Sequence, residues 1–253
     1  MKPLFRNLLI LSVALLWLLP AAAQDSGNIG TLVKITPKDG HDEELIDAIT
    51  AYHKWIADKD GAMRYNWYRV VTGPDSGLYY AWSGGHDWKD FDAEYDWQSD
   101  AGEMMSDKVM PHVEDMDRFM ARTMNDWSHW PEDWDGYDLI HVTDWYVKNG
   151  RYGAFRKGLM RIVKALKAGG TKNYWGFHAM ESGTYAGHIV LVSPTRGWAG
   201  MAETEPTFYD IMVKDLGGEE AFEAFMADWG DTFKQGETET LRWMPGASDY
   251  GDD

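Results

Sequence analysis

The stretch Lys38-Asp39-Gly40-His41 recurs 110 positions later as Lys148-Asn149-Gly150-Arg151. In both places a run of alternating apolar residues precedes the turn residues and a helical pattern follows them. The same offset relates three further pairs: Ser83 with Ser193, Trp88 with Trp198, and Phe91 with Met201. Because these features share one offset, they indicate a duplicated unit.

Each half predicts the order strand, helix, strand, strand, helix, strand. Strand-like runs of the first half are Gly30–Thr36, Tyr65–Thr72, Leu78–Trp82 and Arg118–Met124. Helical spacing of apolar residues occurs at Leu45–Ile56 and Met105–Met116, and Pro111 should end or kink the second helix. The turn residues Gly73–Gly77 predict a hairpin between the second and third strands.

The second half repeats this order. Its strand-like runs are Leu139–Val147, Tyr174–Met180, Gly187–Val192 and Glu239–Trp243, and its helical patterns are Phe155–Leu166 and Phe222–Phe233. A helix with one apolar stripe needs a sheet to pack against, so each half is predicted to be a two-layer α+β unit. The predicted units span residues 24–124 and 138–253, and an acidic, tryptophan-rich linker spans 125–137.

This doubled pattern, together with the run Pro111–Arg118 before the fourth strand, resembles the dimeric α+β barrel superfamily. That superfamily includes antibiotic-biosynthesis-monooxygenase-like, stress-responsive and NIPSNAP-like domains. The resemblance implies two ferredoxin-like βαββαβ units in tandem that close an α+β barrel within one chain. It implies a ligand between sheet and helices or inside the barrel. The known chemistry ranges over cofactor-free oxygenation, haem degradation, chlorite dismutation, isomerisation and cyclisation, so the fold alone does not choose a reaction.

The first residues predict an exported protein. Lys2 and Arg6 precede an apolar run, Leu8–Leu19, and Ala21 and Ala23 follow it. The run is shorter than the roughly 20 residues that span a bilayer. Ala21 and Ala23 provide the small side chains that signal-peptide cleavage requires. Residues 1–23 are therefore predicted to be a signal peptide, the mature protein to be periplasmic or secreted, and no membrane span to remain after cleavage.

Composition excludes several kinds of site. The chain of 253 residues has no cysteine, which rules out thiolate metal sites, cysteine nucleophiles and disulfides. A formal net charge of −17 argues against nucleic acid as a partner, because binding it requires a basic surface. The expected partner is a small organic molecule or a glycan, and the expected assembly is a monomer or a homodimer.

Strand parity predicts a histidine-lined face in the second half. Alternate side chains of a strand share a face, so His141 lies with Trp145, while His178 and His188 belong to the next two strands. If these faces coincide, three imidazoles line one concave surface, with the apolar residues Ile140 and Val142 turned toward the helices. Such a cluster could hold a divalent metal, provide the axial ligand of a haem or supply a general base. The competing interpretation is three separate hydrogen-bonded histidines.

Aromatic residues and arginines predict a second face in the first half. The residues that share it are Tyr65, Trp67, Arg69, Tyr80, Trp82 and Arg122. Guanidinium groups over an aromatic floor suit a planar or carboxylate-bearing ligand, because Arg binds carboxylates in bidentate fashion and stacks on rings. A core of large aromatic residues with Arg at its rim explains the pattern equally well. Trp127, Trp130 and Trp134 of the linker are candidate sugar platforms or anchors that pin the linker to the sheet.

The leading hypothesis is an exported α+β-barrel protein that binds a small organic ligand, carboxylate-bearing or aromatic, in a pocket over the sheet. It would act as a cofactor-independent oxygenase- or isomerase-like enzyme, although the sequence leaves turnover open and identifies no cofactor. The catalytic candidates are His141 and His178. The ligand-binding candidates are Tyr65, Trp67, Arg69, Tyr80, Trp82, Arg122, Trp145 and His188. Alternatives are a carbohydrate-binding or polysaccharide-lyase-like protein, a haem- or metal-binding protein, and a purely structural or partner-binding protein.

Overall fold

The computed structural model describes residues 27–133 and 137–248, so the predicted signal peptide and Trp134 lie outside the described residues. The described residues form eight strands and five α-helices. The strands are β1 (Ile29–Pro37), β2 (Asn66–Thr72), β3 (Tyr79–His86), β4 (Val113–Thr123), β5 (Leu139–Val147), β6 (Gly176–Ser182), β7 (His188–Thr195) and β8 (Phe233–Trp243). The helices are α1 (Asp42–Ile56), α2 (Gln98–Met104), α3 (Tyr152–Gly169), α4 (Phe208–Leu216) and α5 (Glu219–Gly230).

The eight strands close into one barrel in the order β1-β3-β2-β8-β5-β7-β6-β4, which confirms the predicted α+β barrel. The first half contributes the neighbours β4-β1-β3-β2 and the second half contributes β8-β5-β7-β6, so both halves have the same strand order. The halves join where β2 pairs with β8 and where β4 pairs with β6. Because neighbouring strands are antiparallel, β2 and β6 run in the same direction. The β2–β3 and β6–β7 hairpins therefore lie at one end of the barrel, called here the hairpin end.

The strand registers of the two halves coincide at the offset found in the sequence. Lys34 pairs with Tyr80, and the residues 110 positions later, Asp144 and Val190, also pair. For the last strand of each half the offset is 120, since Leu32 pairs with Phe119 and Val142 pairs with Glu239. The additional residues lie before β8, where the second half has α4 and α5. The registers agree with a duplication, and the duplication itself stays a prediction.

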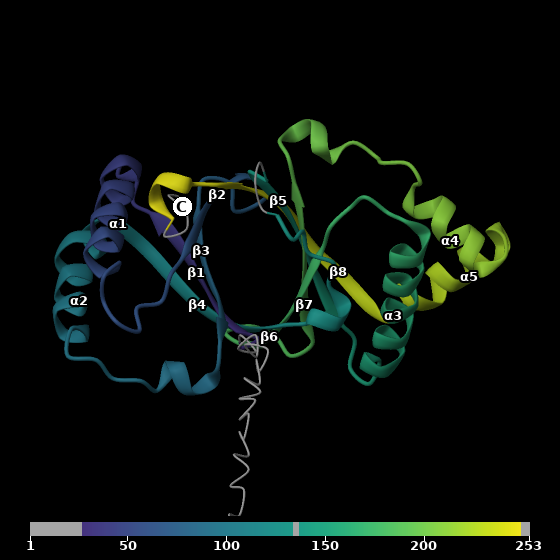
Figure 1. Cartoon of the computed structure of the whole chain (residues 1–253), viewed down its shortest axis with the longest axis horizontal. Helices are drawn as coiled ribbons and strands as arrows, with labels where there is room; N and C mark the ends of the chain where they lie inside the picture. The colour runs from purple at the N-terminus through teal and green to yellow at the C-terminus, as the bar shows by residue number, and fades with distance from the viewer. Residues whose placement is uncertain (1–26, 134–136, 249–253) are drawn as a thin grey trace, which may run out of the picture.

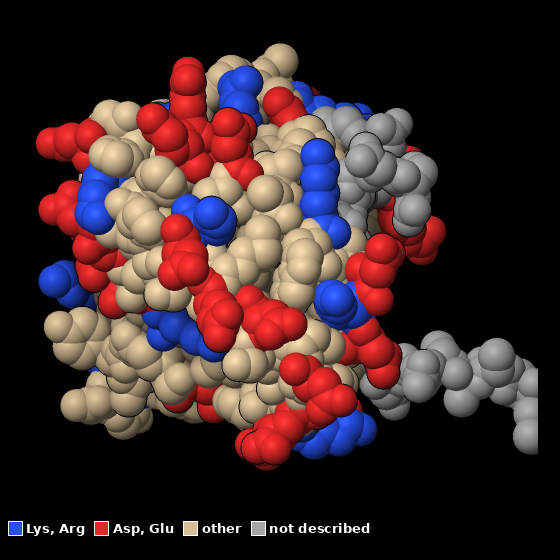
Figure 2. All heavy atoms as spheres, turned by 90° about the vertical axis from the view of Figure 1, so that its left-hand side faces the viewer, with Lys and Arg blue, Asp and Glu red and all other residues tan. Residues whose placement is uncertain are grey.

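The helices cover two opposite flanks of the barrel (Figure 1). On one flank, α1 buries Leu45 and Ile49 against the outward side chains of the first half, including Ile35 and Tyr79. On the other flank, α3 buries Phe155 and Leu159 in a core that includes Phe177 and Ile189. The outer face of the first half carries acidic side chains with basic ones among them, and no continuous basic patch is visible on this face (Figure 2).

The helix predicted at Met105–Met116 is only partly correct, because the α-helix lies before this range and Val113 and Met116 belong to β4. The α-helix α2 is followed by a π-helical turn at Met105–Val109 and a 3-10 turn at Met110–His112, after which β4 begins. Proline lacks an N–H and cannot continue the helical hydrogen bonds. Within the described residues, no helix is both long and apolar enough to cross a membrane.

The predicted linker is fastened to the second half rather than free. Trp127 is 2% exposed and belongs to the core beneath α3. The Nε1–H of Trp175 donates a hydrogen bond of 2.7 Å to the carbonyl oxygen of Trp127, and His129 forms a β-bridge with Trp175. For Trp127, the anchoring interpretation is therefore the one that the structure supports.

Close packing between α3 and α5 predicts a strong effect of one methyl group. A Cβ at Gly158 would lie 2.2 Å from Cδ1 of Trp229. We expect Gly158→Ala to lower the free energy of unfolding by about 1–3 kcal/mol, because the added atom overfills this contact. On the same helix a Cβ at Gly153 meets nothing within 4 Å, so Gly153→Ala should be neutral or stabilising by up to about 1 kcal/mol. Urea denaturation of both variants checks this, and equal effects would contradict it.

Candidate functional site

The barrel encloses a cavity of about 840 Å³, lined by side chains from all eight strands. Large side chains at every inward position would fill an eight-stranded barrel. Here several inward positions carry small residues: Ala121, Val142, Gly176, Val190 and Val192. They leave a space large enough for a ligand of two or three rings.

Away from the hairpin end, the cavity is aromatic and mostly apolar. Trp82 and Trp243 line it there, and the ring of Trp82 lies 4.7 Å from that of His178, centroid to centroid. Nδ1 of His178 is 3.3 Å from Oγ1 of Thr123. Burial lowers the pKa of His178 from 6.5 to about 4, so its imidazole is neutral at pH 7.

The low pKa of His178 predicts an acid-sensitive fold. Between about pH 6.5 and 4 the unfolded chain binds a proton at this position and the folded chain does not, so stability falls as the pH falls through this range. We expect His178→Gln, which removes this titration, to gain melting temperature relative to the unchanged protein when the pH is lowered from about 7 to about 4.5. Calorimetry at both pH values measures the melting temperatures of the two proteins. If the difference between them is the same at both pH values, the low pKa of His178 is contradicted.

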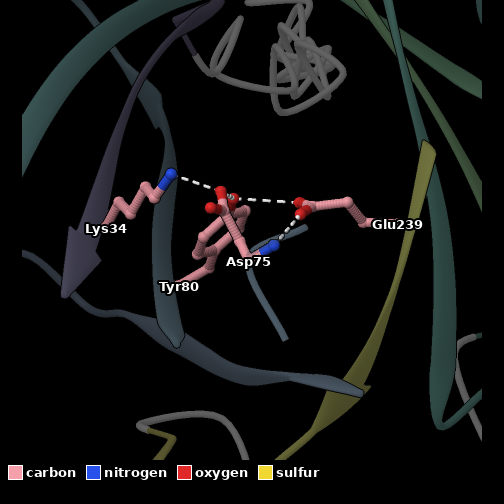
Figure 3. Close-up of polar contacts among 4 residues, drawn as sticks. All are labelled: Lys34, Asp75, Tyr80 and Glu239. Carbon is pink, nitrogen blue, oxygen red and sulfur yellow. Dashed lines mark hydrogen bonds and ion pairs between the residues drawn. The ribbon is translucent and has the colours of Figure 1, made fainter. Parts of the chain in front are cut away.

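At the hairpin end the cavity wall is polar. Four side chains converge there, Lys34 from β1, Asp75 from the β2–β3 hairpin, Tyr80 from β3 and Glu239 from β8 (Figure 3). The Tyr80 hydroxyl lies 2.7 Å from Oδ2 of Asp75 and 2.9 Å from Oε2 of Glu239. Lys34 forms an ion pair with Asp75. Burial raises the pKa of Glu239 above its usual range, and burial and the adjoining carboxyls strongly raise the pKa of Tyr80.

A second polar group lines the wall formed by β5 and β7. Nε2 of His188 is 2.7 Å from Oδ1 of Asp144, and its Nδ1 is 3.1 Å from Oγ1 of Thr184. The ring stacks on Tyr146 at 4.6 Å between centroids. Both ring nitrogens of His188 thus have protein partners, which hold the imidazole and Asp144 in place.

The structure places four of the ten predicted site residues in the cavity wall, namely Tyr80, Trp82, His178 and His188. The face assignment of β5 is wrong. Its apolar residues Ile140 and Val142 point into the cavity, and the alternate residues His141 and Trp145 point outward. Parity shows which side chains share a face but not which face it is. In a barrel with helices outside and a ligand cavity inside, both faces are apolar.

The remaining predicted residues lie outside the cavity. Trp145 packs in the core between α3 and α5, with ring centroids 6.0 Å from Phe155 and 5.5 Å from Trp229. Nδ1 of His141 is 3.4 Å from Oγ1 of Thr240 on the neighbouring strand. The His141 and Trp145 positions therefore do not support the roles predicted for them.

The predicted arginine platform does not form either. Arg69 donates a 3.0 Å hydrogen bond to Asp42, and Arg122 donates a 2.7 Å hydrogen bond to Glu181. Trp67 is in the core beneath α1 and donates to Nε2 of His53 at 2.7 Å. Tyr65 packs against the same core and accepts a 3.2 Å hydrogen bond from Arg118. The cations that would have bound a carboxylate ligand are therefore outside the cavity.

The histidines do not assemble a metal site, because His141 is on the opposite face of the barrel wall from His178 and His188. Across residues 27–133 and 137–248, no group of three or more His, Asp or Glu side chains could hold a metal ion. The cavity also does not fit haem. Its acidic lining residues within the described ranges are Asp75, Asp144, Glu237 and Glu239, and the one Lys or Arg among the lining residues there is Lys34. This wall would repel the two propionates of a haem.

A smaller cleft of about 400 Å³ lies on the linker side. Its lining includes Trp130, Tyr137, Tyr174 and Arg196 together with the carboxylates Glu132 and Asp133. Arg196 lies over the ring of Tyr137, 4.4 Å from its centroid. Of the tryptophans predicted as sugar platforms, Trp130 is in this cleft, and Trp127 is in the core.

Comparison with known proteins supports the fold. No family model matches the chain, and no curated protein matches it. Among solved structures it resembles a candidate monooxygenase from Lactobacillus acidophilus NCFM, at 10% identity over 85% of this chain and 93% of that chain, with a TM-score of 0.53. An anthrone oxidase-like protein matches at 13% identity over 87% and 92%, with a TM-score of 0.50. A chlorite dismutase variant from Candidatus Nitrospira defluvii matches at 9% identity over 87% and 93%, with a TM-score of 0.52.

Matches at these low identities show that the fold is shared, and they do not show that any activity is shared. The matches cover at least 85% of the present chain, so one chain of each neighbour spans both halves of this barrel.

Proposed function

We propose that the protein is a cofactor-independent enzyme that binds a neutral, ring-containing ketone or phenol inside the barrel. The cavity of about 840 Å³, aromatic toward one end and hydrogen-bonding at the other, is the observation that carries this proposal. The apolar part suits fused rings, and the polar wall suits an oxygen that donates or accepts a proton. The proposal places the ligand inside the barrel. The leading hypothesis from the sequence was a pocket over the sheet.

The comparisons support this choice of ligand. Two of the structural neighbours are a candidate monooxygenase and an anthrone oxidase-like protein. An anthrone is a three-ring aromatic ketone, and a molecule of this size is within the range that such cavities hold. A carboxylate-bearing ligand is disfavoured, because the cavity is lined by four acidic side chains and Lys34 is already paired with Asp75.

Titration calorimetry with a matched panel tests the proposal. We expect anthrone, 2-tetralone and 2-naphthol to bind with dissociation constants of about 10 µM. The carboxylate of 2-naphthoate is repelled by the acidic wall, so 2-naphthoate should bind at least about tenfold more weakly. Cellohexaose tests the carbohydrate alternative. Binding of cellohexaose without any ring ketone or phenol, or equal affinity for 2-naphthol and 2-naphthoate, would contradict the proposal.

We also propose that the protein works outside the cytoplasm, as the signal-peptide pattern of residues 1–23 supports. N-terminal sequencing of protein purified from the periplasm or medium of an expressing bacterium should begin at Gln24. Retention of the whole chain in the cytoplasm would contradict export.

A further inference from the structure

The polar cluster at the hairpin end contains fewer protons than its contacts require if both carboxyls are ionised. The Tyr80 hydroxyl has one proton, but it lies within hydrogen-bond distance of both Asp75 and Glu239 (Figure 3). Only one of these contacts can be a bond that Tyr80 donates. In the other, the tyrosine oxygen must accept a proton from a carboxylic acid.

The surroundings of the two carboxyls decide which one is protonated. Asp75 is paired with the ammonium of Lys34, which stabilises its charged form. Glu239 is 5% exposed, and its Oε1 accepts a hydrogen bond of 3.0 Å from the neutral backbone N–H of Asp75. Its burial penalises the charged form. The geometry therefore favours a chain of bonds from Glu239 Oε2–H to Tyr80, and from the Tyr80 hydroxyl to the Asp75 carboxylate.

Other ionisable groups near Glu239 do not change which of the two carboxyls holds the proton. Glu237 lies on the same strand and Asp144 on the neighbouring strand β5, and both line the cavity. The carboxylate whose charge raises the pKa of Glu239 is the adjacent Asp75. Among the described neighbours of Glu239, Lys34 is the cation that lowers its pKa, and burial outweighs this effect because Lys34 is paired with Asp75.

The other half of the barrel has no tyrosine or glutamate at the two positions that correspond to Tyr80 and Glu239. The positions in the other half that correspond to Tyr80 and Glu239 by register are Val190 and Phe119, and both line the cavity as apolar residues. Burying ionisable side chains at two positions where the other half has apolar ones costs free energy. A cluster of this kind facing a ligand cavity points to chemistry.

We propose that Glu239 and Asp75 are an acid–base pair that shares one proton through Tyr80 and catalyses keto–enol isomerisation of a ring ketone in the cavity. This inference rests on the proposed function, since it uses the same cavity and the same class of ligand. The substrate must carry a hydrogen on the carbon next to its carbonyl group.

The steps balance without an oxidant or a cofactor. Oδ1 of Asp75 takes the proton from the carbon, and the electron pair of that C–H bond forms the new carbon–carbon double bond. The carbonyl oxygen takes the proton of Glu239 as its π electrons move onto it. The Tyr80 hydroxyl proton then passes to Oε2 of Glu239. The carboxyl group of Asp75 turns so that its protonated oxygen faces Tyr80 and gives its proton to the Tyr80 oxygen, which restores the starting protonation. The net reaction converts the ketone into its enol.

The proton assignment can be tested without a ligand. In protein with ¹³C-labelled glutamate carboxyls, the Glu239 signal, identified by its loss in Glu239→Gln, should be that of a carboxylic acid at pH 7. Tyr80→Phe should shift this signal, because the phenolic partner is lost, and Glu114→Gln, at an exposed position on β4, should leave it unchanged. A carboxylate signal for Glu239 at pH 7 in the wild type would overturn the assignment, even if Tyr80→Phe failed to fold.

The catalytic role is tested with 2-tetralone in D₂O, where NMR follows deuterium uptake at the carbons next to the carbonyl. We expect the protein to accelerate uptake, and Glu239→Gln and Asp75→Asn each to reduce the acceleration by about 100-fold or more, with the affinity for 2-tetralone kept within about threefold. The Glu114→Gln control should exchange like the wild type.

Three results would separate the claims. Binding of 2-tetralone without accelerated exchange would overturn the acid–base pair and leave the proposed function standing. Accelerated exchange that survives in both carboxyl variants would overturn the assignment to these residues. Failure of every ring ketone and phenol to bind would overturn the proposed function and the catalytic role together, whatever the carboxyl signal shows.

Discussion

The Trp229→Ala variant is expected to unfold with a free energy about 3–5 kcal/mol below that of the unchanged protein. Trp229 is 7% exposed and stacks on Phe155 with 5.9 Å between ring centroids. It also packs edge-on against Trp145, and its Nε1–H donates to the carbonyl oxygen of Phe155 at 3.0 Å. Truncation leaves a cavity and removes this hydrogen bond, and each of these changes destabilises the fold.

The matched control for this variant is Trp198→Ala. Trp198 is 49% exposed, so its truncation should change the free energy of unfolding by no more than about 0.5 kcal/mol. Urea denaturation followed by circular dichroism compares the two variants. Similar losses for both would mean that α5 does not pack on α3 through Trp229.

The second large effect concerns ligand binding. Val142 points into the middle of the cavity from β5, so Val142→Trp should fill the space that the ligand needs. We expect the affinity for 2-tetralone to fall by about 100-fold or more, which corresponds to roughly 2.8 kcal/mol. The fold should persist, because an indole can occupy empty volume without displacing core side chains.

Gln235→Trp is the control for Val142→Trp. Gln235 is exposed on β8 and does not line the cavity, so an indole there should leave the affinity for 2-tetralone unchanged. Circular dichroism and calorimetry of both variants separate loss of binding from loss of folding. Unchanged affinity in a folded Val142→Trp protein would place the ligand elsewhere.

Much of the fold follows from local patterns. The turn residues between β2 and β3 predict their hairpin, and the apolar stripe of α3 predicts its buried face. Long strands with charged residues are harder to predict. β4 begins at Val113, five residues before the predicted start, because its exposed residues Glu114–Asp117 lack apolar alternation yet pair with β1. The sequence prediction also missed α4, which precedes the helix predicted at Phe222–Phe233. Gly217, with a left-handed backbone, ends α4.

The candidate site was only partly predictable. Tyr80 and Trp82 stand out in the sequence as aromatic residues on one face of a strand, and both line the cavity. Asp75 and Glu239 do not stand out, because one belongs to a turn and the other to a strand that alternates acidic and apolar residues. They are 164 positions apart, and closure of the barrel brings them together. That contact depends on how β2 pairs with β8, which no local pattern specifies.

The central claim is that the ligand lies inside the barrel. Nuclear Overhauser effects between bound 2-tetralone and selectively labelled methyl groups of the protein test it most directly. We predict contacts to the inward methyl groups of Val142, Val190, Val192 and Leu241. Contacts confined to outward methyl groups such as those of Val163, or an effect only on the aromatic rings of Tyr137 and Tyr174 in the smaller cleft, would contradict the account.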